Sequence, residues 1–165
     1  MPTLAEEWRG IGDFVKIIRN HVRRVLASEV EDDRSLLHRA ATDGSLDACK
    51  TLLEQLPREA INAVAKGGIT ALHLAAAMGH SSVCHLLLES QRFHAINAKD
   101  MVGRTALHFA AREDLADFCK SLLEQPAFTE TDAVDRWSNT ALAVALHCHK
   151  NAAASVIREH MTSGN

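Results

Sequence analysis

Hydrophobic positions along most of the chain follow helical spacing in short segments, which polar turns separate. In residues 69–88, Leu72 is followed by paired alanines on the same helical face, and Cys84 is followed one turn later by Leu87 and Leu88. Each pattern predicts a short helix with one apolar face. Helices of this length are not stable alone in water, so they must pack against neighbouring helices.

The same pattern occurs four times, in segments that begin at Arg34, Ile69, Arg104 and Asn139. A spacing of 35 residues aligns a leucine, a histidine and a cysteine column, namely Leu37, Leu72, Leu107 and Leu142, then His38, His73 and His108, then Cys49, Cys84 and Cys119. A repeat architecture produces equal intervals automatically, whereas metal ligands need only meet in space. The histidine and cysteine columns are therefore interpreted as repeat positions rather than as ligands.

Signals for the helix boundaries recur in each unit. A hydroxyl residue precedes every first helix, where it can satisfy a free N–H of the first turn, and these residues are Ser35, Thr70, Thr105 and Thr140. The break between the two helices of a unit falls on Gly44, Gly79, Asp114 and His149. These residue types tolerate a left-handed backbone better than most others. A polar turn then links each unit to the next and predicts a hairpin-like finger.

Together these features resemble the ankyrin repeat. The family pattern has a glycine two residues before T-P-L-H, then L-A-A, Gly-His and Leu-Leu. It matches residues 67–88 closely, residues 100–123 well and residues 34–53 moderately. The resemblance implies an all-α ankyrin-repeat solenoid of about four helix-turn-helix repeats with hairpin-like fingers. It also implies that the imidazoles of the histidine column bridge the hydroxyl residue and the backbone of the adjoining unit.

The expected organisation has three parts: an N-terminal helical cap at residues 1–30, an ankyrin-repeat domain at 31–160 and a disordered tail at 161–165. The repeats are expected at residues 31–64, 65–99, 100–134 and 135–160. In the first part, Asp13 is placed to cap a helix with one apolar face and one basic face. We interpret this helix either as a cap over the first repeat or as a separate docking helix.

Departures from the family pattern add further expectations. The usual proline is replaced by Leu36, Ala71, Ala106 and Ala141. This removes a residue whose fixed φ favours the first helical position. Each linker is longer than the family norm, so the outer turn should bulge. The fourth repeat has Ala143 in the histidine column and Arg158 where a second leucine is expected. That repeat is interpreted as a terminal cap, because terminal repeats face water on one side.

Composition and charge narrow the classes of partner. The chain has 165 residues, a net charge of -3 and only 4% aromatic residues, with no tyrosine. The charge argues against a nucleic-acid binder that works by bulk charge, and the scarcity of aromatics argues against base stacking. No apolar run is long enough to cross a membrane, and the N-terminus lacks a signal peptide. We therefore expect an intracellular monomer, cytoplasmic or nuclear, that binds neither nucleic acid nor membrane.

The resemblance also implies where a protein partner would bind, namely the finger tips and the exposed side of the first helices. Five apolar residues at such positions form a stripe, consisting of Ile69, Met78, Met101, Val102 and Trp137. Three cations border the stripe: Arg104, Arg112 and Arg136. Grouped apolar residues of this kind mark contact surfaces. We expect a protein partner with apolar and acidic side chains, although Met101 and Trp137 packing on neighbouring fingers is the structural alternative.

Other functions are weighed against this expectation. No glycine-rich phosphate loop, catalytic triad or converging carboxylate pair is evident, so we expect neither enzymatic activity nor a cofactor. A regulatory subunit of an enzyme is one alternative. A hydroxylation substrate is another, because Asn62 and Asn97 occupy the finger asparagine of the family pattern. A metal or thiol site at His147-Cys148-His149 is a weaker alternative, because helix neighbours point in different directions.

Overall fold

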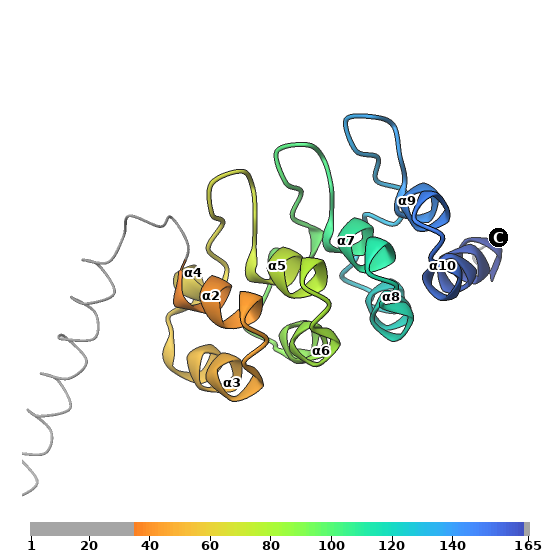
Figure 1. Cartoon of the computed structure of the whole chain (residues 1–165). Helices are drawn as coiled ribbons and strands as arrows, with labels where there is room; N and C mark the ends of the chain where they lie inside the picture. The colour runs from red at the N-terminus through yellow and green to blue at the C-terminus, as the bar shows by residue number, and fades with distance from the viewer. Residues whose placement is uncertain (1–34, 164–165) are drawn as a thin grey trace, which may run out of the picture. The chain divides into compact units, whose positions relative to one another are not determined.

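The computed structural model describes residues 35–163, which belong to one compact unit. The expected helical cap at residues 1–30 lies outside the described residues. Within them the structure is a row of helix pairs, with a finger projecting between consecutive pairs (Figure 1). The expected all-α repeat fold is confirmed.

Each repeat contributes a first helix on the side of the fingers and a second helix on the opposite side (Figure 1). The first helices are α2 (Leu36–Thr42), α5 (Ala71–Ala77), α7 (Ala106–Arg112) and α9 (Ala141–His147). The second helices are α3 (Leu46–Gln55), α6 (Ser81–Glu89), α8 (Ala116–Leu123) and α10 (Asn151–Ser163). Packing therefore runs mainly between neighbouring repeats, which gives the unit its linear character.

The core lies between the helices and is built from the aligned columns. Leu72 and Leu107 are fully buried, as are all three members of the cysteine column. Ala76 and Ala111 are also fully buried, and their small side chains let consecutive first helices approach closely. Burial raises the pKa of the column's thiols, to about 11 for Cys49 and to about 12 for the other two. The cysteine column is therefore core, as the spacing predicts, and its thiols stay protonated at neutral pH.

The predicted helix boundaries hold, but the predicted hydroxyl cap does not form in every repeat. The residues at the break have positive φ in all four repeats: 67° at Gly44, 77° at Gly79, 60° at Asp114 and 55° at His149. The hydroxyls of Thr70 and Thr140 accept hydrogen bonds from the first turn, at 3.4 and 3.2 Å. The Ser35 hydroxyl instead lies 2.7 Å from Nδ1 of His38. Asp114 also caps α10, because its carboxylate accepts from the Ala153 N–H at 2.8 Å.

Two of the three longer linkers contain an extra helical turn, whereas the third, between α8 and α9, contains none. The first linker contains α4 (Arg58–Ile61) and the second contains the 3₁₀ turn η1 (Ala95–Asn97). Arg92 ties the two linkers together, since its guanidinium donates to the Glu54 and Leu56 carbonyls at 2.9 and 2.6 Å and also to that of Leu53. These are the free carbonyls at the end of α3, so Arg92 satisfies them as a C-terminal cap.

Asn62 and Asn97 also join consecutive linkers. The Asn62 amide donates to the Arg92 carbonyl at 2.9 Å and its oxygen accepts from the His94 and Ala95 N–H groups. Asn97 repeats this arrangement one unit later, donating to the Ala127 carbonyl at 2.7 Å. These contacts give both asparagines a structural role.

The C-terminal boundary differs from the sequence-based expectation. We expected a disordered tail at residues 161–165, but α10 continues to Ser163. No glycine or proline interrupts the segment before Gly164, and the Thr162 hydroxyl donates to the Glu159 carbonyl at 2.9 Å. Arg158 on this helix is exposed.

Consecutive fingers are joined by backbone hydrogen bonds. The Met101 N–H donates to the Gly67 carbonyl at 2.7 Å, and the Arg136 N–H donates to the Val102 carbonyl at 2.8 Å. Within a finger, single antiparallel bridges pair Ala65 with Ile69 and Val134 with Thr140. The fingers are therefore hairpin-like, as predicted, and form a continuous hydrogen-bonded row.

The close approach of the fingers requires glycine at one position. A Cβ on Gly68 would lie 2.6 Å from the Lys99 carbonyl oxygen, and one on Gly103 would lie 2.9 Å from that of Val134. Both glycines also have positive φ, at 79° and 86°. The equivalent residue of the last finger is Ser138, with φ of 63°, and this serine is exposed.

Candidate functional site

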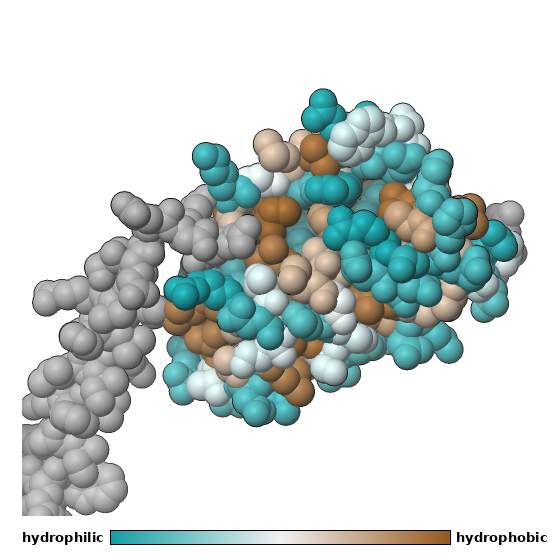
Figure 2. Space-filling view, in the orientation of Figure 1, coloured by the Kyte–Doolittle hydropathy of each residue, from teal (hydrophilic) through white to brown (hydrophobic). Residues whose placement is uncertain are grey.

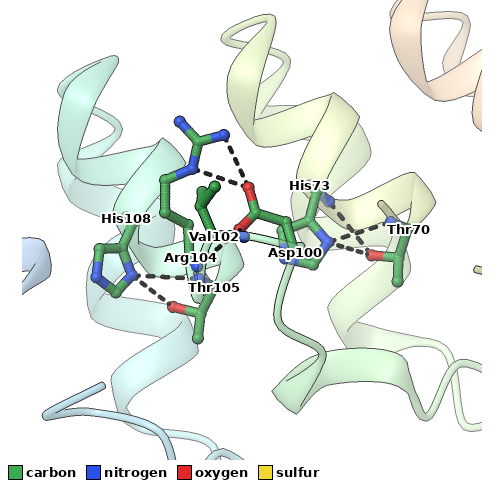
Figure 3. Close-up of polar contacts among 7 residues, drawn as sticks. All are labelled: Thr70, His73, Asp100, Val102, Arg104, Thr105 and His108. Atoms are coloured by element: carbon green, nitrogen blue, oxygen red, sulfur yellow. Dashed lines mark hydrogen bonds and ion pairs between the residues drawn. The ribbon is translucent and has the colours of Figure 1, made fainter. Parts of the chain in front are cut away.

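Two members of the histidine column, His38 and His108, join their first helix to the finger that follows it. Nε2 of His38 lies 2.9 Å from the Ile69 carbonyl, and Nε2 of His108 lies 3.1 Å from that of Asn139. At the other edge of the ring, Nδ1 of His108 lies 3.0 Å from the Thr105 hydroxyl and accepts from the Thr105 N–H at 3.2 Å (Figure 3). The bridging role that the resemblance implies is therefore present at both histidines.

His73 makes only half of this bridge. Its Nδ1 accepts from the Thr70 N–H at 3.2 Å, so its proton resides on Nε2 (Figure 3). Nε2 is buried and has no hydrogen-bond partner in the described part of the chain. Burial lowers the pKa of His73 to about 4, although the Asp100 carboxylate and the backbone of Arg104 and Ala98 oppose this effect.

The depressed pKa of His73 predicts that acid destabilises the fold. Between its folded pKa of about 4 and the ordinary value near 6.5, the unfolded chain binds a proton that the folded chain does not. The contribution of neutral His73 to stability is therefore fully present above pH 6.5, and it is lost as the pH falls towards 4. We expect the free energy of unfolding from urea melts to drop by roughly 2 kcal/mol between pH 7 and pH 5 through this residue.

The control for this prediction is a pair of variants. His73→Gln should reduce the pH dependence to the part that belongs to His108, whose pKa is also lowered by burial, whereas His94→Gln, at an exposed position, should leave the wild-type slope unchanged. Equal slopes for the wild type and His73→Gln would contradict the prediction.

Two of the three bordering arginines are engaged within the repeats. Arg104 donates from Nε to Asp100 at 2.8 Å (Figure 3) and its guanidinium lies 4.6 Å from the centre of the Phe109 ring. Arg112 pairs with Glu113 at 2.8 Å, and its guanidinium lies 5.5 Å from the same ring. Both cations are thus partly neutralised and stacked on an aromatic face.

Phe109 is the residue that the sequence interpretation overlooked. It is buried under the two guanidiniums, and the His73 ring meets it edge-on with centroids 5.6 Å apart. Its column holds Arg39, Leu74 and Val144 in the other repeats, so an aromatic residue here is particular to the third. This difference from the other repeats is the sequence feature by which Phe109 could have been identified.

The apolar stripe is most exposed at the finger tips. Met101 is 82% exposed and Trp137 is 61% exposed, while Met78 at the end of α5 is 54% exposed. Ile69 and Val102 are only partly exposed. Figure 2 shows hydrophobic side chains around the fingers and first helices, interrupted by hydrophilic ones. Trp137 therefore projects from its turn, as expected. Met101 instead lies partly against the neighbouring finger, because its Sδ is 3.5 Å from where a Cβ on Gly67 would be.

Arg136 and Trp137 form the end of the row of fingers. The guanidinium of Arg136 lies 5.3 Å from the centre of the Trp137 ring, and both side chains are exposed. Asp135, which is buried, holds this turn by accepting from the Trp137 and Asn139 N–H groups, both at 2.9 Å. Asp100 plays the same part in the preceding finger. A tryptophan and an arginine are thus presented on a turn with fixed geometry.

The His147-Cys148-His149 segment ends α9 at the surface. Nδ1 of His147 lies 3.0 Å from the Ala143 carbonyl, and the Cys148 thiol is exposed. Residues 35–163 contain no group of three or more potential ligands placed to hold a metal ion. The geometry here is that of an ordinary helix end.

A metal measurement tests this segment directly. We expect purified protein to carry no stoichiometric zinc by elemental analysis and chelator to leave its melting temperature unchanged, because structural zinc requires four converging ligands. One equivalent of tightly bound zinc would refute this expectation.

These features define a helical-repeat protein with a displayed row of fingers. Residues 10–100 match the family described as ankyrin repeats in three copies, and residues 102–136 match a single ankyrin repeat. The chain belongs to the ankyrin-repeat family. No curated protein matches it. Ankyrin repeats are generally protein–protein interaction modules and are typically non-enzymatic. In residues 35–163, no helix has the length and apolar character needed to span a membrane.

Proposed function

We propose that this chain is a non-enzymatic protein-interaction module that binds a partner protein through its finger tips and concave face. The proposed contact residues are the apolar stripe and its bordering arginines. The observation that carries the proposal is the exposure of Met101 and Trp137 on neighbouring fingers, whose backbones are held in place by hydrogen bonds. Exposed apolar residues on a rigid support are typical of binding surfaces.

The charges around the stripe indicate the chemistry of the partner. Arg136 lies against Trp137 and pairs with no acid in the described residues. A partner that buries Trp137 would bring its own side chains next to this guanidinium, where a carboxylate is favoured. We propose a partner with apolar and acidic side chains, bound by a monomer in the cytoplasm or nucleus.

Replacing both residues at the last finger tip tests this function. We expect the double substitution of Arg136→Ala and Trp137→Ala to weaken partner binding by at least about 2 kcal/mol, roughly 30-fold, because exposed tryptophan and arginine often dominate binding energy. Helical content and melting temperature should change little, since both side chains are exposed. Partners captured from native cells by the full chain would be quantified against this variant.

Met161→Ala on α10 is the matched control, because it removes a partly exposed apolar side chain away from the fingers. It should capture the same partners as the wild type. A double variant that is destabilised yet still binds would place the contact surface elsewhere.

A further inference from the structure

One position recurs at the tip of three consecutive fingers. It is occupied by Lys66, Met101 and Arg136, all of which are exposed, and we call these residues the tip row. The backbone hydrogen bonds of Met101 and Arg136 to the preceding fingers fix the order and direction of the row. The tip row thus presents a cation, an apolar side chain and a second cation in line.

The two cations of the tip row have no internal acid. Neither Lys66 nor Arg136 forms an ion pair in the part of the chain that the structure describes. Nearby cations do, since Lys99 pairs with Glu130 at 2.7 Å and Arg104 pairs with Asp100 at 2.8 Å. An acidic partner would therefore meet its strongest attraction at the two ends of the row.

The spacing of the tip row restricts the conformation of the partner. Packed helices lie about 8–10 Å apart, so successive tips are separated by about that distance. A polyproline II helix rises about 9 Å in one turn of three residues, and it returns a side chain to the same face at each turn. A β-strand places same-face side chains about 6.6 Å apart, which does not match this step. The tip row therefore fits a polyproline II segment better than a strand.

Trp137 strengthens the case for polyproline II. Its ring is exposed beside Arg136 at the end of the row. Aromatic surfaces are the usual docking sites for polyproline II segments. These segments are already extended before they bind, so they lose little conformational entropy on binding. An α-helix would need about two turns per finger, and with a diameter of about 10–12 Å it is wide for a row of single side chains.

Building on the proposed function, we infer that the tip row binds a polyproline II segment of the partner protein with acidic residues six positions apart and an apolar residue midway. One carboxylate pairs with Lys66, the apolar side chain covers Met101 and the other carboxylate pairs with Arg136. A proline next to that second acid packs on Trp137. Recognition runs through side chains, because the Met101 and Arg136 N–H groups are already used between fingers.

Selection from a random library of 12-residue peptides displayed on phage tests this inference with the full chain as bait. Counter-selection uses the charge-reversed double variant, Lys66→Glu with Arg136→Glu. We expect the surviving peptides to carry two acids six residues apart with an apolar residue between them. In fluorescence anisotropy, a selected peptide should bind the double variant at least 10-fold more weakly than the wild type.

Two matched variants make the result specific. Lys120→Glu makes the same charge change as Lys66→Glu alone, at an exposed position of α8, and should leave binding unchanged. Peptides with lysine in place of the acid that faces Lys66 should recover binding to Lys66→Glu alone. Selected peptides with acids at helical spacing, peptides without acids, or binding indifferent to the double variant would each overturn the inference.

Failure of the inference and failure of the proposed function have different signatures. Peptide binding that depends on Met101 and Trp137, but not on Lys66 and Arg136, would leave the proposed interaction surface intact. It would refute only the proposed pairing of two acidic residues with the ends of the tip row. Absence of any enriched peptide, or binding indifferent to Met101→Ala and Trp137→Ala, would refute both.

Discussion

Replacing Leu107 with alanine is expected to lower the free energy of unfolding by about 2–5 kcal/mol, as for other fully buried leucines. Leu107 has no exposed surface and belongs to the core cluster that runs through the repeats. Its removal would open a void between α7 and its neighbours, which the packed alanines cannot fill. Urea melts followed by circular dichroism measure the change.

The last repeat supplies the matched control for this substitution. Leu142 occupies the same column but is only partly buried. Leu142→Ala should therefore cost roughly 1 kcal/mol, because less apolar surface is withdrawn from water at this site. Equal losses of stability at the two positions would show that the alignment of the repeats is wrong, or that the last repeat is not a terminal cap.

Gly68→Ala is expected to destabilise the fold by roughly 3 kcal/mol through two separate effects. A non-glycine residue at its φ of 79° costs roughly 1–2 kcal/mol. The added methyl would also lie 2.6 Å from the Lys99 carbonyl oxygen and 2.9 Å from Asp100 Cα, and such overpacking costs roughly 1–3 kcal/mol more. Urea melts of the variant measure the sum.

Gly79→Ala separates the two effects. Gly79 has a similar φ of 77°, but a Cβ there would have nothing within 4 Å. This variant should lose only the conformational part, roughly 1–2 kcal/mol. If Gly68→Ala cost no more than Gly79→Ala, the fingers would be free to move apart and would not form a fixed row.

The sequence was most informative where one physical requirement recurs in every repeat. Leu107, His108 and Gly79 could be assigned because their equivalents repeat at a constant spacing of 35 residues. Each assignment follows from a local need, for burial, for a polar bridge or for left-handed backbone. These needs are the same in each unit, so the pattern alone reveals them.

The candidate site was harder to predict because it depends on contacts peculiar to one repeat. Arg104 and Arg112 were expected simply to border the stripe, but their stacking on Phe109 requires the positions of three side chains. The unpartnered Nε2 of His73 is likewise peculiar to its repeat, because the equivalent atoms of His38 and His108 each reach a carbonyl of the next finger. The helical continuation of α10 to Ser163 was missed because no apolar pattern marks its last turn.

Ser138 limits how the array can be lengthened by protein engineering. In the two preceding fingers, the next backbone comes so close that only glycine fits. A unit fused after α10 and stacked in the same geometry would bring a carbonyl oxygen against the Cβ of Ser138, and Ala143 would offer it no imidazole. Extension would therefore require Ser138→Gly, with Ala143→His to restore the bridge. The two substitutions would give the fourth repeat the glycine and the histidine with which the third repeat meets its successor.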